Sequence, residues 1–292
     1  MPTGIRYQER DKLLLAELGE LGLLDTDTIR QRHFPQDNSG RACPKKLAQY
    51  ESVGLVQSAA IQLQNKDTKV WMLTPHGAGE VARLTGHEPS RPGRADPPKP
   101  SKLLHRLGMV RTRLALDDAF VAARLSAPTW LMEQDTYPGA NVGDPAPRRF
   151  LLYESFGQGS TLVKCNPDAS CCAHLPGGWQ LVAYFEYDRS TETNARVAEK
   201  LPGYATLLAQ RRYREHWPQV GDRHIVRILF ICQSPERITN LRKAFDQVPI
   251  QRYLRFAVER DLAEGGELLT RLIWYDHEGE RRAILKAPPS SS

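Results

Sequence analysis

The stretch Gln180-Leu-Val-Ala-Tyr-Phe-Glu-Tyr-Asp188 decides the fold class of this chain. It is apolar from Leu181 to Phe185, which is the pattern of a β-strand covered on both faces. Two carboxylates, Glu186 and Asp188, stand at its end. Because open α/β sheets tend to carry function where a buried strand emerges, both acids are candidate functional residues.

The segments around this strand predict a mixed sheet with helices on its faces. Strands are expected at residues 129–134, 160–164, 169–173 and 224–232. Helices are expected at residues 102–124 and 235–245, with interrupted helical sequence over 194–216. The order α-β-β-β-α-β, with a trailing segment to Leu285, is the core order of PD-(D/E)xK restriction-endonuclease-like domains. The predicted fold class is therefore α/β for this C-terminal part and α+β for the whole chain.

The N-terminal part predicts three helices, a hairpin and a fourth helix. The helices are expected at residues 9–21, 26–33, 41–53 and 74–84, and the hairpin strands at 55–63 and 69–73 around a turn over 64–68. Asp25 is the expected cap of the second helix. This order is that of a winged helix-turn-helix domain.

In a winged helix the third helix enters the major groove, and basic wing residues meet the DNA backbone. The expected DNA contacts are therefore Arg41, Lys45 and Lys46 on the third helix, with Lys66 and Lys69 in the wing. A winged helix that makes only protein contacts is the alternative, because a fold does not fix a function.

Composition shifts divide the chain into parts. Five prolines between residues 87 and 101 predict a semi-rigid, solvated linker, and the Pro/Ser-rich residues 287–292 predict a disordered tail. The predicted domains are thus residues 1–86, a winged helix, and residues 102–286, a restriction-endonuclease-like domain.

The charge balance favours a polyanionic partner. The chain has 292 residues, with 40 Lys and Arg against 34 Asp and Glu, a formal net charge of +6. The run Arg211-Arg-Tyr-Arg214 adds Arg211, Arg212 and Arg214 as candidate phosphate contacts, although a solvated helix face is an equal interpretation.

The expected location is a reducing cytoplasm, without membrane association. No apolar run is long enough to span a bilayer, the first residues have no apolar signal core, and the five cysteines are odd in number.

Several short segments, taken together, are similar to those of one known family. They are His105-Arg-Leu with Leu114-Ala-Leu, Trp130-Leu-Met-Glu133, Asn166-Pro-Asp-Ala169, Phe185-Glu-Tyr-Asp-Arg-Ser-Thr-Glu192 and Lys200-Leu-Pro-Gly-Tyr204. Through them nearly the whole chain resembles the replication-relaxation proteins of plasmids and integrative elements, which join a winged helix to a nuclease-like domain. The resemblance implies plasmid replication, DNA relaxation or conjugative mobilisation, with double-stranded DNA and other replication or conjugation proteins as partners. It also suggests kinship with relaxases that nick transfer origins.

The resemblance implies a metal-dependent centre. In the PD-(D/E)xK superfamily a Pro-Asp precedes a strand that bears Asp or Glu, one residue, and then Lys. Asp168 and Glu186 match the two carboxylates and would bind Mg²⁺, and Glu133 is a candidate third ligand. Asp188 occupies the lysine position, so Lys200 on the following helix is the candidate to polarise the attacking water. Because Leu201 precedes Pro202, non-helical backbone is expected there, and the direction of Lys200 stays open.

Other chemistry near this centre also stays open. Tyr184, Tyr187 and Tyr204 could attack a phosphodiester covalently or could simply pack as aromatics. A thiol and imidazole group lacks the paired C-x-x-C spacing of zinc sites; its members are Cys165, Cys171, Cys172 and His174.

Two hypotheses follow. In the first, the chain nicks DNA with Asp168, Glu186 and Lys200. In the second, it is a non-catalytic winged-helix regulator or relaxosome accessory factor with a degenerate nuclease domain. The sequence leaves the bound DNA sequence and the oligomeric state open, a homodimer included.

Overall fold

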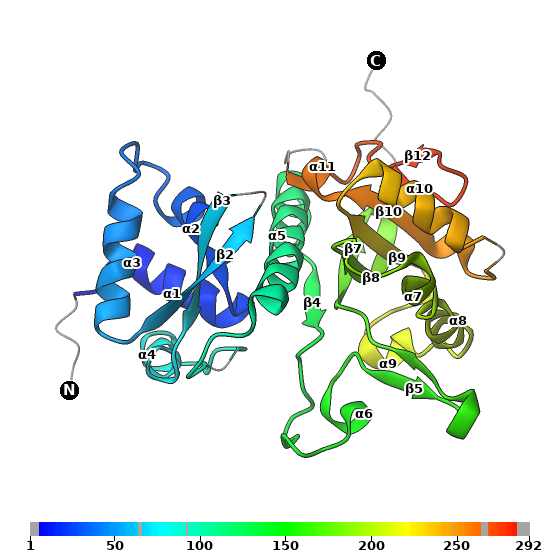
Figure 1. The fold of residues 1–292 in the computed structure, drawn as a ribbon, viewed down its shortest axis with the longest axis horizontal. Helices are drawn as coiled ribbons and strands as arrows, with labels where there is room; N and C mark the ends of the chain where they lie inside the picture. Colours follow the sequence, from blue (N-terminus) through cyan, green and yellow to red (C-terminus); the bar gives the residue numbers. More distant parts are fainter. Residues whose placement is uncertain (1–5, 64–65, 92, 247, 264–267, 285–292) are drawn as a thin grey trace. The chain divides into compact units, whose positions relative to one another are not determined.

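The computed structural model describes residues 6–63, 66–91, 93–246, 248–263 and 268–284 (Figure 1). The chain folds into two compact units, Met1–Val110 and Arg111–Ser292, and the division falls inside helix α5 (Pro100–Ala122). The described residues contain helices and a large mixed sheet, which confirms the predicted α+β class.

Unit 1 has the predicted order of helix, helix, helix, hairpin and helix. Its elements are α1 (Glu9–Leu21), β1 (Leu24–Asp25), α2 (Thr26–His33), α3 (Ala42–Ser52), β2 (Val56–Leu63), β3 (Lys66–Leu73) and α4 (Pro75–Thr85). The strands form one antiparallel sheet in the order β1-β3-β2. The prediction of a turn over residues 64–68 was wrong at its end, because Lys66 already pairs with Leu63 across the hairpin.

Local side-chain chemistry starts these helices where the sequence predicted. The Asp25 carboxylate accepts a hydrogen bond of 3.0 Å from the Thr28 amide at the start of α2, which confirms the predicted cap. The Asp37 carboxylate accepts bonds of 2.8 Å and 3.0 Å from the Ala42 and Cys43 amides at the start of α3. These caps satisfy amides that have no partner within their own helix.

Part of the expected linker packs on unit 1 instead of lying in solvent. The Arg91 amide donates to the Gly19 carbonyl at 2.7 Å, and the Arg94 amide donates to the Leu73 carbonyl at 3.0 Å. Pro100 and Ser101 already belong to α5. Arg91 and Arg94 of the expected linker are therefore held by backbone hydrogen bonds to α1 and β3. The predicted tail, residues 287–292, lies outside the described residues.

Unit 2 is built on a seven-stranded mixed sheet in the order β12-β11-β10-β9-β8-β7-β4. The strands are β4 (Thr129–Met132), β7 (Ala169–Leu175), β8 (Trp179–Asp188), β9 (His224–Cys232), β10 (Leu254–Val258), β11 (Trp274–Tyr275) and β12 (Arg281–Arg282). The pairs β8/β9 and β9/β10 are parallel, and the other pairs are antiparallel.

Two strands differ from the prediction. The strand expected at residues 160–164 begins at Val163 as β6 (Val163–Cys165), and it pairs with β5 (Glu154–Phe156) in a separate two-stranded sheet. The trailing segment contributes β10, a central strand that the sequence reading did not single out. It is only five residues long, and Arg255 interrupts its apolar residues, so periodicity alone does not assign it.

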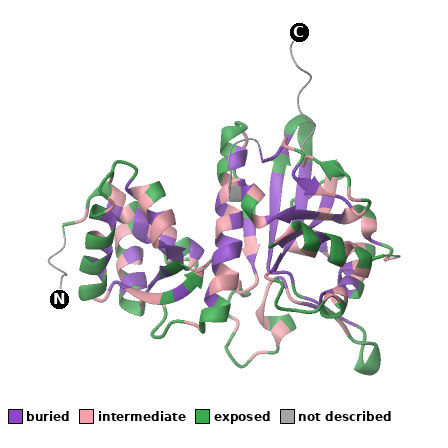
Figure 2. Ribbon diagram, turned by 45° about the horizontal axis from the view of Figure 1, so that its top comes forward, coloured by how far each residue is buried: buried purple, intermediate pink, exposed green. Residues whose placement is uncertain are grey.

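The core of unit 2 lies on both faces of β8. On one face, Val182 and Tyr184 pack with α8 (Leu201–Ala209) and α10 (Pro235–Ala244). On the other face, the Phe185 ring lies 5.1 Å from that of Trp130, whose indole N–H donates to Asp117 of α5 at 2.7 Å. Figure 2 shows the central strands buried beneath helices whose outer sides are exposed. The remaining helices are α6 (Ala146–Arg149), α7 (Asn194–Ala198), α9 (Tyr213–His216) and α11 (Glu259–Ala263).

Two glycines of α4 test the packing of unit 1. A Cβ at Gly77 would lie 1.9 Å from the Leu55 carbonyl oxygen, whereas a Cβ at the exposed Gly79 would meet nothing within 4 Å. We expect Gly77→Ala to destabilise the protein by roughly 1–3 kcal/mol or more through this overlap. Gly79→Ala should stabilise it by up to about 1 kcal/mol, because alanine favours the helix. Urea unfolding of both variants measures this, and equal shifts would contradict the packing described.

Candidate functional site

Glu186 is the buried centre of the candidate site. Its carboxylate, near the end of β8, is covered by two side chains of the segment that follows. The Lys200 ammonium donates to Oε2 at 2.6 Å, and the Tyr204 hydroxyl donates to Oε1 at 2.6 Å. Both carboxylate oxygens thus have a partner, as a buried charge requires.

Asp168 lies beside Glu186 because β7 and β8 pair in a fixed register. Ala169 pairs with Phe185, so Asp168, just before β7, comes opposite Glu186. The Asp168 amide donates to the Phe185 carbonyl at 3.0 Å, and its Oδ2 accepts from the Tyr187 amide at 2.7 Å. The backbone of β8 therefore fixes both the position and the direction of this carboxylate.

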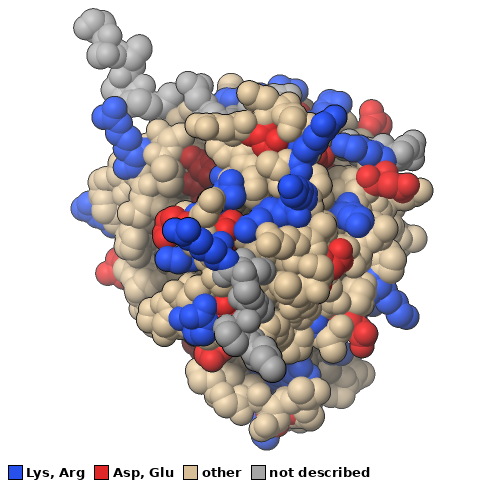
Figure 3. Space-filling model, turned by 90° about the vertical axis from the view of Figure 1, so that its left-hand side faces the viewer, with Lys and Arg blue, Asp and Glu red and all other residues tan. Residues whose placement is uncertain are grey.

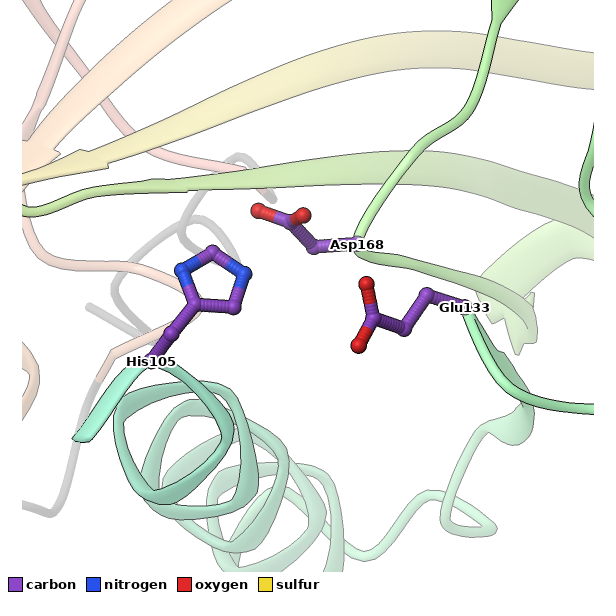
Figure 4. A group of neighbouring side chains, drawn as sticks. All are labelled: His105, Glu133 and Asp168. Atoms are coloured by element: carbon purple, nitrogen blue, oxygen red, sulfur yellow. The ribbon is translucent and has the colours of Figure 1, made fainter. Parts of the chain in front are cut away.

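Glu133 brings a third carboxylate from the neighbouring strand. Its amide donates to the Asp168 carbonyl at 2.9 Å, just past the end of β4. A ligand oxygen of Glu133 and one of Asp168 lie within 4.8 Å of each other, and Figure 4 shows the two carboxylates close together. Among the described residues of unit 2, no third His, Cys, Asp or Glu ligand atom joins them at this spacing. His105, also drawn there, lies on α5 within unit 1.

The start of α8 directs Lys200 toward the carboxylates. Lys200 has helical backbone angles, φ −77° and ψ −24°, and Pro202 sits in the first turn, where its missing N–H costs nothing. Leu201 is helical and 2% exposed, so burial outweighs the steric bias that was expected from the following proline. A Cβ at Gly203 would lie 2.0 Å from the Lys164 carbonyl oxygen, so glycine allows α8 to lie directly on β6.

Burial and charge shift the ionisation of this group. Burial raises the pKa of Glu186 to about 7, with a further contribution from Asp168, although Lys200 and Tyr204 oppose the shift. Burial lowers the pKa of Lys200, but Glu186 and Asp168 outweigh this effect and leave it raised. The ammonium therefore remains charged near neutral pH, and Glu186 is the member of the pair that titrates.

Asp188 lies apart from this carboxylate group. Its oxygens accept from Arg237 at 2.5 Å and 3.2 Å, and from the Ser190 amide at 2.8 Å. Both side chains are largely buried, at 6% and 11% exposed. Asp188 was expected to be catalytic. The structure instead places it in a bidentate ion pair that joins β8 to α10.

The three tyrosines near the site are buried and hydrogen-bonded. Tyr184 bonds His216 at 2.8 Å, Tyr187 accepts from Gln233 at 3.3 Å, and Tyr204 donates to Glu186. Burial raises the pKa of each, which opposes formation of a nucleophilic phenolate. These features favour packing over covalent attack.

The cysteines do not form a metal site with one another. All five are buried and free, His174 is exposed, and none belongs to a ligand-spaced group among the described residues. Burial raises the pKa of Cys165 and Cys171, so these thiols stay protonated and are poor zinc ligands.

The basic residues expected to contact DNA divide into exposed and internally bound groups. Lys45 is exposed on α3, and Arg41 is exposed just before this helix. Lys69 is exposed with its ammonium 5.6 Å from the Trp71 ring. Lys66 is 72% exposed but lies 3.2 Å from Asp27. Lys46 instead lies 3.1 Å from the buried Asp11 and covers the Tyr50 ring.

The arginine run of unit 2 divides in the same way. Arg211 is exposed, whereas Arg212 binds Glu154 and Glu215. Arg214 donates to the Val220 carbonyl at 3.0 Å. Only Arg211 of the three faces solvent without a bond of this kind in the part of the chain described.

Sequence reasoning missed two residues of this region. Tyr204 had been considered only as a nucleophile or a packing residue, yet it holds Glu186, and Arg237 had no expected role, yet it neutralises Asp188. The spacing of Lys200 and Tyr204, one helical turn apart, was the available signal for the first. No local pattern links Arg237 to Asp188, because the two lie on different elements 49 residues apart.

The raised pKa of Glu186 predicts a pH-dependent stability. Between its unfolded value of about 4.5 and its folded value of about 7, the folded protein binds the extra proton, so this contribution is lost as pH rises through that range. We expect the stability of wild type relative to Glu186→Gln to fall between these pH values and then to level off. Urea titrations in metal-free buffer measure it, with exposed Glu199→Gln as control. Parallel wild-type and Glu186→Gln curves would contradict the shift.

Comparison with known proteins identifies the family of this chain. No described helix is long and apolar enough to cross a membrane. No curated protein and no solved structure matches the chain. The replication-relaxation family model matches residues 15–220, which is well over half of the chain and includes Glu133, Asp168, Glu186 and Lys200. The chain belongs to the replication-relaxation family.

Proposed function

We propose that this protein acts on double-stranded DNA in the replication, relaxation or mobilisation of a plasmid or integrative element. Unit 1 is then a winged helix that binds the duplex, and unit 2 is a PD-(D/E)xK-type domain that nicks one strand. One observation carries the proposal. At the ends of the adjacent strands β4, β7 and β8, four side chains lie close together: Glu133, Asp168, Glu186 and Lys200. Family membership supports the replication setting.

The donor set fits a magnesium ion. Glu133 and Asp168 offer hard oxygen ligands, and Mg²⁺ in such enzymes is commonly held by one or two carboxylates together with substrate phosphates. When bound, the ion would polarise the scissile phosphate and stabilise negative charge that develops on it. Glu186 is less available as a ligand, because Lys200 and Tyr204 occupy both of its oxygens.

The protein groups around this position suit general acid–base chemistry. Glu186 has a pKa of about 7 through burial, which is near the value that favours a general base at neutral pH. Lys200 holds a positive charge beside it and is 36% exposed at the side chain, so it can reach a phosphate or a water molecule. Tyr187 keeps the Asp168 carboxylate in one orientation through its backbone amide.

A non-catalytic DNA-binding role is the second candidate. The observation that favours it is the closed contact of Glu186 with Lys200 and Tyr204, which satisfies the buried acid without any ligand. In that case the ion pair serves the stability of unit 2, and the protein acts as a regulator or accessory factor that holds DNA.

Exposed cations on α3 support DNA binding by unit 1. Figure 3 looks from the side of Figure 1 on which α3 lies, and it shows Lys and Arg atoms grouped across this face with fewer Asp and Glu atoms among them. Arg41, just before α3, and Lys45, on α3, are exposed and are the proposed major-groove contacts. Lys66, Lys69 and Arg211 are proposed as further backbone contacts.

Nicking of supercoiled plasmid distinguishes the two candidates. With the element's own origin region and Mg²⁺ or Mn²⁺, we expect wild type to convert supercoiled DNA to the open-circular form. Asp168→Asn and Lys200→Ala should lose at least about a hundredfold in rate, in keeping with the loss of an acid–base or electrostatic group. Lys243→Ala, which removes an exposed charge on α10, is the matched control. Retained DNA binding without nicking by wild type would support the accessory role instead.

Paired lysines on α3 test the proposed DNA face. Lys45→Ala should weaken duplex binding and reduce the slope of log K against log salt by about 0.9, the value for one lost phosphate contact. Lys46→Ala should instead lower the stability of the fold, because buried Asp11 loses the closer of the two cations beside it, Lys46 at 3.1 Å and Arg10 at 3.5 Å. Gel shifts at several salt concentrations and urea unfolding separate the effects. If Lys46→Ala alone affected DNA binding, the proposed face would be wrong.

A further inference from the structure

Two arginines of neighbouring parallel strands share a small hollow on the sheet of unit 2. Arg227 lies on β9 and Arg255 on β10, and the register pairs Arg255 with Leu229, so both side chains project from the same face of the sheet. The hollow between them has a volume of about 10 Å³, and its other walls include Leu181, Leu229 and Trp274. The arginines are each only partly exposed.

Neither guanidinium has a carboxylate as its partner among the described residues. Arg227 donates to the Val226 carbonyl at 2.9 Å. Arg255 donates to the Leu254 carbonyl at 2.6 Å and to the Arg252 carbonyl at 3.3 Å. These bonds satisfy some N–H groups, but they do not neutralise two positive charges that face one hollow.

Asp276, an acid whose charge acts on Arg255, is engaged by other groups. The Asp276 carboxylate accepts from Arg282 at 2.8 Å and from the amides of Glu278 and Glu280 at 3.0 Å and 2.9 Å. Burial, and then the charge of Arg255, lower the pKa of Arg227 to about 10. Burial also lowers the pKa of Arg255, although the charge of Asp276 opposes the shift. Such a like-charge pair is costly when isolated and is relieved by an anion between the two groups.

We propose that Arg227 and Arg255 form a binding site for a phosphate group on this face of unit 2. Two planar guanidinium groups match the oxygens of a phosphate in shape and in charge. The enclosed volume is about that of one water-sized group, so one phosphate oxygen enters while the rest of the group lies at the mouth. A nucleobase is too large for the hollow. The phosphate belongs either to a DNA backbone or to a free anion.

The site is separate from the carboxylate group described above. Arg227 follows Val226, which pairs with Val182, whereas Glu186 pairs with Phe230 four positions further along β8 and β9. The side chains also lie on opposite faces of the sheet. Arg227 pairs with Ala183, and because side chains alternate along a strand, Glu186, three positions after Ala183, projects from the other face. A DNA backbone held at Arg227 and Arg255 would therefore be anchored away from the proposed centre of hydrolysis.

The first test measures binding of inorganic phosphate to the full chain. At constant ionic strength, phosphate in place of chloride should raise the melting temperature of wild type by roughly 2–4 °C. Arg227→Gln and Arg255→Gln should abolish this rise, and Arg227→Lys should keep part of it. Arg148→Gln, which removes an exposed arginine of α6, should leave it unchanged. No rise in wild type, or the same rise in both glutamine variants, would overturn the proposal.

The second test identifies the source of the phosphate and rests on the proposed DNA binding. If the site holds a DNA phosphate, Arg227→Gln should reduce the slope of log K against log salt by about 0.9 for duplex binding, while Arg148→Gln does not. An unchanged slope, with the thermal effect of phosphate still lost, assigns the site to a free anion. The phosphate measurement needs neither DNA nor nicking, so failure of the proposed function would be seen separately from failure of this site.

Discussion

The pairing of β7 with β8 is the constraint on which the rest of the candidate site depends. The register that sets Ala169 against Phe185 brings Asp168 opposite Glu186, and the Tyr187 amide then fixes the Asp168 carboxylate. A shift of one residue would turn Glu186 to the opposite face, away from Lys200 and Tyr204. Because β4 pairs with β7 in turn, the same register also sets the position of Glu133.

The Glu186 carboxylate depends on the start of α8 for both of its side-chain partners. Gly203 lets this helix approach the backbone of β6, and the helix then presents Lys200 and Tyr204 to Glu186. Lys200 thus reaches Glu186 from a helix start, whereas Asp188, two residues after Glu186 on the strand, is held by Arg237. Each of these two carboxylates near the end of β8 therefore has a cation from a later segment of the chain.

The cations of this basic protein fall into distinct classes. Several are internal: Lys46, Arg212, Arg214 and Arg237 bind carboxylates or carbonyls and stabilise their own unit. Others, such as Arg41 and Lys45, face solvent. Arg227 and Arg255 form a third class, partly buried and without acidic partners among the described residues. Net charge alone cannot separate these classes, because it counts each residue equally.

By itself, the sequence determined the elements and several candidate residues. The uninterrupted apolar run of β8 and the turn, cap and proline signals of unit 1 are local properties, so they could be read along the chain. Glu186 was indicated by its place at the end of a buried strand, and similarity to a family added Asp168, Lys200 and Glu133. The tertiary structure alone decided that Lys200 faces Glu186, that Asp188 pairs with Arg237, and that Arg227 meets Arg255. These contacts join segments that strand register and helix packing bring together, and no local pattern encodes such distances.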